Sequence, residues 1–290
     1  MATARSKPEL LAIVGPTASG KSTLALKIAQ EFGGEIVSAD SWAVYRGFNI
    51  GTSKPSLRQQ KAVKHWLIDV RDANDGFNAP MFKELAQTAI TDIRKRGKLP
   101  ILVGGTGLYV DSLLYDFGFL DNQSPAEREV LDNTDLDDLL KIAKKSKIDL
   151  TGVDIRNKRR VIRAIESGGQ KPTRAKLLPN TLIVGIQPIP QQLKFNIEGR
   201  VDQMLADGLQ FEVEKLSKEY GWDVEPMKGI GYQQWREYFE GTQDLDQTRE
   251  RIISATNQLA KRQRTWFKRN PDIQWFSSAE VAQIYLTKRL

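Results

Sequence analysis

Short apolar runs alternate with helical patterns along most of this chain. The runs at 10–14, 35–39, 99–103 and 181–186 each have the length of one buried strand. Strands that alternate with helices are typical of a parallel sheet, because each crossover lays a helix on one face of that sheet. The pattern therefore predicts an α/β fold in which a parallel sheet is flanked by helices.

The helical patterns have recognisable starts and stops. In the segment 78–96, Asn78 is placed to cap the first turn, Pro80 falls within that turn, and Gly97 follows the last one. Its apolar residues recur at helical spacing, which predicts one buried face. Further helices are predicted at about 21–32 and, after the last strand, near 190–206, 209–219, 231–240 and 245–268.

The stretch 116–178 interrupts the alternation of strands and helices. It is charged, mostly helical in pattern and without a convincing strand. We interpret it as a mostly helical insertion domain. The core domain would then combine 1–115 with 179–290, which includes the C-terminal helices.

Residues 15–22 match a complete phosphate-loop motif, Gly-x-x-x-x-Gly-Lys-Ser, between the first strand and the first helix. In such a loop, backbone amides, the helix N-terminus and the lysine hold phosphate oxygens, while the serine hydroxyl can hold Mg²⁺. A mere connecting turn would not need every fixed position filled. We therefore predict a P-loop NTPase-like sheet that binds a di- or triphosphate, with Mg²⁺ as cofactor on Ser22. The residues expected to bind phosphate are Gly15, Pro16, Thr17, Ala18, Ser19, Gly20, Lys21 and Ser22.

Composition narrows the class of protein further. The chain has no cysteine and a single histidine, His65, which excludes disulfides and argues against a zinc site. No apolar run is long enough to span a bilayer, and the polar N-terminus lacks the features of a signal peptide. We expect a cytoplasmic protein without a membrane partner.

Basic residues are clustered in two places. The formal net charge is +7, and 156–176 carries eight basic residues against the single acid Glu166. The segment 261–269 adds five basic residues and no acid. Two solvated helix faces would explain such runs, but their clustering favours a surface for a polyanion such as nucleic acid.

Asp40 is the acid best placed for chemistry beside the phosphates. Ligands of parallel sheets bind beyond the carboxyl ends of the strands, where the phosphate loop, Asp40 and 104–107 would meet. The strand at 99–103 ends in Gly-Gly-Thr, whereas an ordinary P-loop NTPase carries an acid that helps to hold Mg²⁺. Asp40 could hold metal, act as a general base or cap its strand, and the residues alone leave these open.

Several further stretches follow the phosphate loop in a characteristic order. With the loop they are 15–22, Asp-Ser-Trp-Ala-Val-Tyr-Arg-Gly at 40–47, 50–55, 65–69, Val-Gly-Gly-Thr-Gly-Leu-Tyr at 103–109, 159–166, 200–205, Gly-Ile-Gly-Tyr at 229–232 and 258–266. In sequence and in order, these stretches resemble the tRNA dimethylallyltransferases. No stretch beyond the phosphate loop is decisive, but together they are specific.

The resemblance implies transfer of a dimethylallyl group from dimethylallyl diphosphate to N6 of the adenosine 3′-adjacent to the anticodon of tRNA. The tRNAs would be those that read codons beginning with U. The phosphate loop would hold the diphosphate leaving group, with further contacts from Thr17 and Arg200. Asp40 would take the proton from the adenine amine, and Thr106 would help to position the acceptor.

The same resemblance implies a set of contacts with the tRNA anticodon stem-loop, made by a protein that we expect to be a monomer. From residue types alone, Arg200 could instead pair along its helix, and Tyr232 could belong to the core. The residues carried over as tRNA contacts are Asp40, Ser41, Trp42, Ala43, Thr106, Arg128, Arg159, Arg160, Val161, Ile162, Arg163, Lys228, Gly231, Tyr232 and Gln233.

The chain also departs from the pattern of that family. Ala43 stands where many relatives have Gln, His65 lacks a second histidine beside it, and 154–158 reads Asp-Ile-Arg-Asn-Lys. The region 120–150 is shorter than usual, and no Cys/His finger is present, as in bacterial members. These departures concern the fit to tRNA rather than the reaction.

Two other classes of function use the same loop. A P-loop kinase of a nucleotide or small metabolite could use Asp40 as its base, but would have little need for two basic clusters. An RNA-binding ATPase would be expected to show an acid after the strand at 99–103. A relative that prenylates free AMP would have less use for the basic insertion.

Overall fold

The computed structural model describes residues 7–120, 125–170 and 172–290. The chain divides into two compact units: a larger one that comprises the residues up to Leu114 and from Leu177 onward, and a smaller one at Tyr115–Lys176. None of the helices in the described ranges is both long and apolar enough to cross a lipid bilayer.

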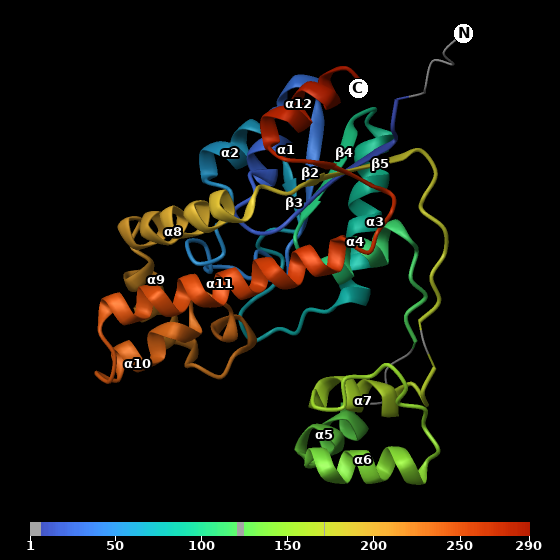
Figure 1. The fold of residues 1–290 in the computed structure, drawn as a ribbon, viewed down its shortest axis with the longest axis vertical. Coiled ribbons are helices and arrows are strands. Elements are labelled where there is room, and N and C mark those ends of the chain that lie inside the picture. The colour runs from blue at the N-terminus through green and yellow to red at the C-terminus, as the bar shows by residue number, and fades with distance from the viewer. Residues whose placement is uncertain (1–6, 121–124, 171) are drawn as a thin grey trace. The chain divides into compact units, whose positions relative to one another are not determined.

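A fully parallel sheet forms the centre of the larger unit (Figure 1). Its strand order within the described residues is β3-β2-β4-β1-β5-β6. The α/β prediction is therefore confirmed. The strands are β1 (Leu10–Val14), β2 (Gly34–Ala39), β3 (His65–Trp66), β4 (Leu99–Gly104), β5 (Thr181–Ile186) and β6 (Ile273–Phe276).

Helices surround this sheet and extend beyond the carboxyl ends of its strands. The start of α3 follows from the sequence, because the Asn78 side chain accepts a hydrogen bond of 3.0 Å from the amide of Met81. The helices of the larger unit are α1 (Lys21–Phe32), α2 (Leu57–Ala62), α3 (Ala79–Lys95), α4 (Gly107–Leu114), α8 (Pro190–Ala206), α9 (Leu209–Tyr220), α10 (Arg236–Phe239), α11 (Leu245–Phe267) and α12 (Ala279–Thr287), with short 3₁₀ turns at Glu225–Lys228 and Gln233–Trp235.

One apolar core joins the sheet to α1 and α12. Leu11 and Ile13 of β1 are fully buried against Leu24 and Ile28 of α1, in a cluster that Leu286 of α12 completes. The alternation along β1 directs these side chains to one face. The core thereby fixes the start of α1 directly after β1, which is the arrangement a phosphate loop requires.

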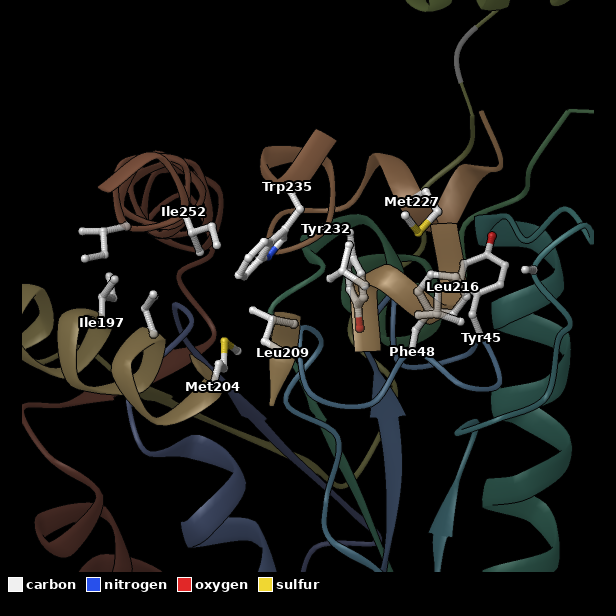
Figure 2. Packing of buried hydrophobic residues seen from close by; sticks show 14 of the residues in the cluster. Tyr45, Phe48, Ile197, Met204, Leu209, Leu216, Met227, Tyr232, Trp235 and Ile252 are labelled. Carbon is white, nitrogen blue, oxygen red and sulfur yellow. The ribbon is translucent and has the colours of Figure 1, made fainter. Parts of the chain in front are cut away.

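A second core lies beyond the carboxyl ends of the strands and joins α8, α9, α11 and the loop after β2 (Figure 2). Tyr232 and Trp235 are among its largest fully buried side chains. The Phe48 ring meets the Tyr232 ring edge-on, at 5.1 Å between centroids. This core fixes the positions of α8 and α11, which line a cavity beside the phosphate loop.

The smaller unit has its own core of helices α5 (Pro125–Asn133), α6 (Leu136–Lys145) and α7 (Lys158–Glu166). Val161 and Ile162 are fully buried there beside Leu139. The resemblance implies that both residues contact tRNA. Their side chains instead fill the core, so they can support a contact surface on α7 but cannot themselves reach a ligand in this conformation.

Several elements differ from the expectations. The predictions from the sequence do not include β3, β6, α2 or α12, of which β3 is only two residues long and β6 only four. The helix predicted at 231–240 is a 3₁₀ turn followed by the four residues of α10. Gly231 there has a φ of +96°, which a helix cannot accommodate.

Candidate active site

A cavity of about 860 Å³ opens beside the phosphate loop in the larger unit. Its walls come from the carboxyl ends of β2 and β4, the loop 51–55, and the helices α8 and α11. Lys21, Asp40 and Arg200 all line it. Three groups far apart in the sequence are thus brought to one space, at the sheet edge where ligands of such folds bind.

The phosphate loop has the tight backbone path that its glycines permit. Gly20 has a φ of +89° and directly precedes α1. A Cβ on Gly15 would lie 2.5 Å from the carbonyl oxygen of Ile186, so a larger residue would push the loop off β5. Lys21 folds back, and its Nζ donates to the Pro16 carbonyl at 3.1 Å. The N-terminus of α1 is therefore presented to the cavity as an anion site.

One polar face of α8 supports the loop from the side. Gln192, Asn196 and Arg200 are spaced four residues apart and all line the cavity. The Asn196 amide donates to the Ala18 carbonyl at 3.0 Å, and Nη1 of Arg200 donates to Oγ1 of Thr17 at 2.9 Å. Arg200 thus reaches the phosphate loop rather than a neighbour on its own helix. The i, i+4, i+8 spacing was the signal in the sequence that could have revealed this face.

Gln263 of α11 supports the loop from the other side, a role that sequence reasoning missed. Its Oε1 accepts a hydrogen bond of 2.8 Å from the backbone amide of Thr17. A Cβ on Gly105 would lie 2.3 Å from its Nε2, so Gln263 also packs against the turn after β4. Gln263 lies within a strongly basic run, so the sequence points to the charges of that run rather than to an uncharged amide side chain.

Lys21 and Arg200 beside the loop both have lowered pKa values. Burial and, to a smaller extent, the nearby charge of Arg200 lower the pKa of Lys21 to about 8, against the opposing charge of Asp40. Burial also lowers the pKa of Arg200, against the opposing charge of Asp40. A diphosphate bound in the cavity would stabilise the charged forms of Lys21 and Arg200, because its negative charge lies beside both side chains.

This arrangement makes diphosphate binding depend on pH. A lowered pKa means that Lys21 of the free protein loses its proton as the pH rises through about 8, while the bound anion favours the protonated form. We expect the affinity for inorganic pyrophosphate to fall by up to about tenfold per pH unit above that value. Calorimetry from pH 7 to pH 9.5, with Lys21→Met as the control for the titration of the ligand itself, measures it. A wild-type profile that runs parallel to that of the variant would contradict the assignment.

Asp40 directly follows β2, and one of its carboxylate oxygens accepts backbone hydrogen bonds. Its Oδ1 accepts from the backbone amides of Trp42 at 2.8 Å and Ala43 at 3.3 Å. The capping role weighed from the sequence is therefore real. Among the described residues Oδ2 accepts no hydrogen bond, and Asp40 lines the cavity, so one oxygen remains for a substrate.

Thr106 ties the turn after β4 to the backbone on either side of Asp40. The backbone amide of Ser41 donates to Thr106 Oγ1 at 3.3 Å, and the Thr106 amide donates to the Ala39 carbonyl at 3.3 Å. Thr106 thus fixes the Asp40–Ser41 turn. Contact with an acceptor substrate stays a prediction for this residue.

The segments carried over as tRNA contacts in the larger unit differ in exposure. Trp42 and Gly231 line the cavity, and Lys228 and Gln233 are exposed. Ala43 and Tyr232 are buried, with Tyr232 only 1% exposed. A direct side-chain contact of Tyr232 with RNA is therefore not available in this conformation, and its phenol donates instead to Oε1 of Glu212 at 2.8 Å.

In the smaller unit, a buried carboxylate engages two of the arginines carried over as tRNA contacts. The Glu166 side chain is 1% exposed and pairs with Arg128 at 3.0 Å and Arg163 at 3.4 Å. Arg128 also pairs with Asp132. These two arginines hold the unit together, whereas Arg159 and Arg160 are exposed on α7.

Fold and site together define a P-loop protein of the parallel α/β class, in which an anion site and a carboxylate face one cavity. The family model described as IPP transferase matches residues 43–270, and the chain belongs to this family. The resemblance stated from the sequence is confirmed.

Similar proteins with known names agree with this membership. A tRNA dimethylallyltransferase of Pediococcus pentosaceus is 40% identical over 96% of this chain and 94% of its own length. One of Staphylococcus carnosus is 37% identical over 96% and 93%. The crystal structure of the full-length tRNA isopentenylpyrophosphate transferase of Bacillus halodurans is similar with a TM-score of 0.75 and 33% identity, covering 98% of this chain and 97% of that one. The kinase alternative is not favoured.

Proposed function

We propose that this enzyme transfers the dimethylallyl group of dimethylallyl diphosphate to N6 of the adenosine 3′-adjacent to the anticodon, in tRNAs that read codons beginning with U. The product is N6-isopentenyladenosine. The observation that carries the proposal is a phosphate loop that shares one cavity with a strand-end carboxylate, in a chain of the IPP transferase family.

The cavity matches both halves of the donor. Backbone amides of the phosphate loop, Lys21 and Arg200 surround the place for a diphosphate. Apolar side chains of α8 and α11, among them Val201 and Ile252, line the same cavity and suit a five-carbon chain. As the C–O bond to the diphosphate breaks, negative charge grows on the leaving oxygen, where preorganised cations lower the barrier.

Asp40 supplies the base in this proposal. The N6–C bond forms as the C–O bond breaks, and the amine proton passes to Oδ2 of Asp40. The backbone bonds to Oδ1 hold the carboxylate in place during the transfer. A positioned base of this kind contributes about 10²- to 10⁴-fold.

Ser22 fits Mg²⁺ as a single protein ligand. Ser22 lines the cavity in the first turn of α1, and Mg²⁺ in phosphate sites takes one or two protein ligands and fills its shell with water and phosphate oxygens. Within the ranges that the structure describes, no group of three His, Cys, Asp or Glu side chains could hold a metal ion. When bound, the ion would neutralise charge on the diphosphate.

The acceptor must leave its stack to reach the cavity, as in other enzymes that modify bases. Bases of a single-stranded loop are the least costly to extract. Trp42 lines the cavity and offers an aromatic surface to such a base. An anticodon loop meets these demands.

Arg159 and Arg160 of α7 are proposed to contact phosphates of the tRNA. We expect that replacing both by Ala lowers the affinity for tRNA and reduces the slope of log K against log salt by about 1 to 2, because each phosphate contact adds about 0.7 to 0.9. Filter binding across a salt series measures it. Replacing Lys144 and Lys145, two exposed residues of α6, removes the same charge as a control. An unchanged slope in the arginine variant would remove these residues from the interface.

The proposal as a whole is tested against the kinase by offering both donors. The protein is incubated with unmodified tRNA and either dimethylallyl diphosphate or ATP, and the digested nucleosides are analysed by mass spectrometry. We expect isopentenyladenosine with the first donor and no phosphoryl transfer with the second. Consumption of ATP without any prenylated nucleoside would overturn the proposal.

A further inference from the structure

We infer that Glu212 is a positioning residue for this reaction: its carboxylate clamps the loop 49–51 and thereby fixes the wall of the active-site cavity at 51–55. The inference rests on the proposed function, since it assigns a role within that reaction. Glu212 lies in the first turn of α9, outside the phosphate loop and outside the residues that line the cavity.

Both oxygens of the Glu212 carboxylate are engaged by donors from the loop after β2. The amide of Asn49 donates to Oε2 at 3.1 Å, and the amide of Gly51 donates to Oε1 at 3.2 Å. The amide of Ile50 lies 2.9 Å from both oxygens. Three consecutive amides that point at one carboxylate form an anion nest, here filled by a side chain of the protein itself.

A fourth donor links this clamp to the segment 229–232. The Tyr232 phenol donates to Oε1 of Glu212 at 2.8 Å. Burial, followed by the charge of Glu212, raises the pKa of Tyr232 well above its ordinary value, so the phenol stays a donor. A Cβ on Gly51 would lie 2.6 Å from the Tyr232 ring, which places the loop directly on that ring. Figure 2 shows Tyr232 within the core between α9 and the loop.

The clamped loop continues into the cavity wall. Gly51, Thr52, Ser53, Lys54 and Pro55 all line the active-site cavity. On the side of α8 a second hollow of about 600 Å³ lies against the same loop and shares lining residues with the cavity, so the packing of the loop is incomplete there. The position of this loop therefore depends on the hydrogen bonds from Glu212 of α9 more than on packing against α8.

Lys54 connects the clamped loop to the cavity that holds Asp40. Its side chain is 3% exposed and pairs with Asp69 at 2.5 Å, and it also donates to the Tyr45 carbonyl. Burial lowers the pKa of Lys54, whereas the charges of Asp69, Glu212 and Asp40 oppose that shift. Lys54 and Asp40 line the same cavity, so a displaced loop would change the surroundings of the base.

The test compares Glu212→Gln with the matched control Glu214→Gln. Glu214 lies on the same helix and pairs with the exposed Lys218. An amide has one acceptor oxygen, and its NH₂ group opposes the backbone donors, so E212Q should release part of the loop. We expect kcat for dimethylallyl transfer to fall about 100-fold, because small misplacements near reacting groups have effects of this size. The KM for dimethylallyl diphosphate should stay close to the wild-type value, since the phosphate loop is untouched, and E214Q should match the wild type throughout.

Amide hydrogen exchange at 49–51 supplies a readout that is independent of activity. We expect faster exchange there in E212Q, with α1 and the sheet protected as in the wild type. If E212Q does not fold, Tyr232→Phe removes one donor only and should show a smaller loss of kcat in the same direction. A folded E212Q with wild-type kcat, or with unchanged exchange at 49–51, overturns the inference. If the wild-type protein shows no transfer activity, the proposed function itself is overturned. If the wild type is active and E212Q is equally active, only the inference about Glu212 is overturned.

Discussion

Asp40→Asn is expected to slow dimethylallyl transfer by about 10³-fold and to leave pyrophosphate binding almost unchanged. The amide cannot take up the proton of the adenine amine, and loss of a positioned base has effects of this size. The Asn oxygen can still accept from the amides of Trp42 and Ala43, so the turn keeps its shape. Single-turnover assays with tRNA and calorimetry with pyrophosphate measure the two effects.

A surface carboxylate gives the matched control for this variant. Asp72 pairs with Arg46, and both side chains are largely exposed. We expect Asp72→Asn to retain the full rate. A rate for D40N within about tenfold of the wild type would remove Asp40 from the role of base, since a positioned base contributes at least about 10²-fold. Its structural role as a strand-end cap would remain.

Arg200→Ala is expected to reduce kcat by about 10²- to 10³-fold and to weaken pyrophosphate binding. The guanidinium lies in the cavity and bonds Thr17 of the phosphate loop, so its removal takes away both a cation for the leaving group and a support of the loop. Losing one preorganised donor at a site of developing charge has a cost of this order. Arg200→Lys keeps the charge and should recover part of the rate.

The control for Arg200 lies on the same helix. Lys194 of α8 is exposed and pairs only loosely with Glu198 at 3.8 Å. Lys194→Ala removes an equal charge from α8 and is expected to leave both kcat and binding unchanged. Equal losses in R200A and K194A would indicate a long-range effect of net charge and contradict a direct role of Arg200 at the leaving group.

The sequence predicted those parts of the site that follow from local rules. The phosphate loop needed only its motif and the strand and helix around it, and α3 needed only its cap and its period. Asp40 followed from the end of an apolar run. The spacing of polar residues on α8 could have revealed its polar face, but not which segment it contacts. The contacts of Asn196 and Gln263 with the loop span 178 and 246 residues of sequence.

Burial was the second property that local rules could not supply. Val161 and Ile162 belong to a motif rich in arginine, yet the packing of three short helices places both in the core. Tyr232 likewise lies in the core, where its ring faces Gly51. Arg163 resembles its neighbours Arg159 and Arg160 in sequence, but only the folded unit brings the Leu120 carbonyl to its guanidinium.

The central claim is that one cavity joins a diphosphate clamp to a base for an adenine amine. The most direct measurement offers the protein dimethylallyl diphosphate and an anticodon stem-loop with adenosine, or with guanosine, at the position 3′-adjacent to the anticodon. We predict isopentenyladenosine and an equal amount of released pyrophosphate from the first stem-loop, and neither from the second. Pyrophosphate release without a prenylated nucleoside, or equal modification of both stem-loops, would contradict the account.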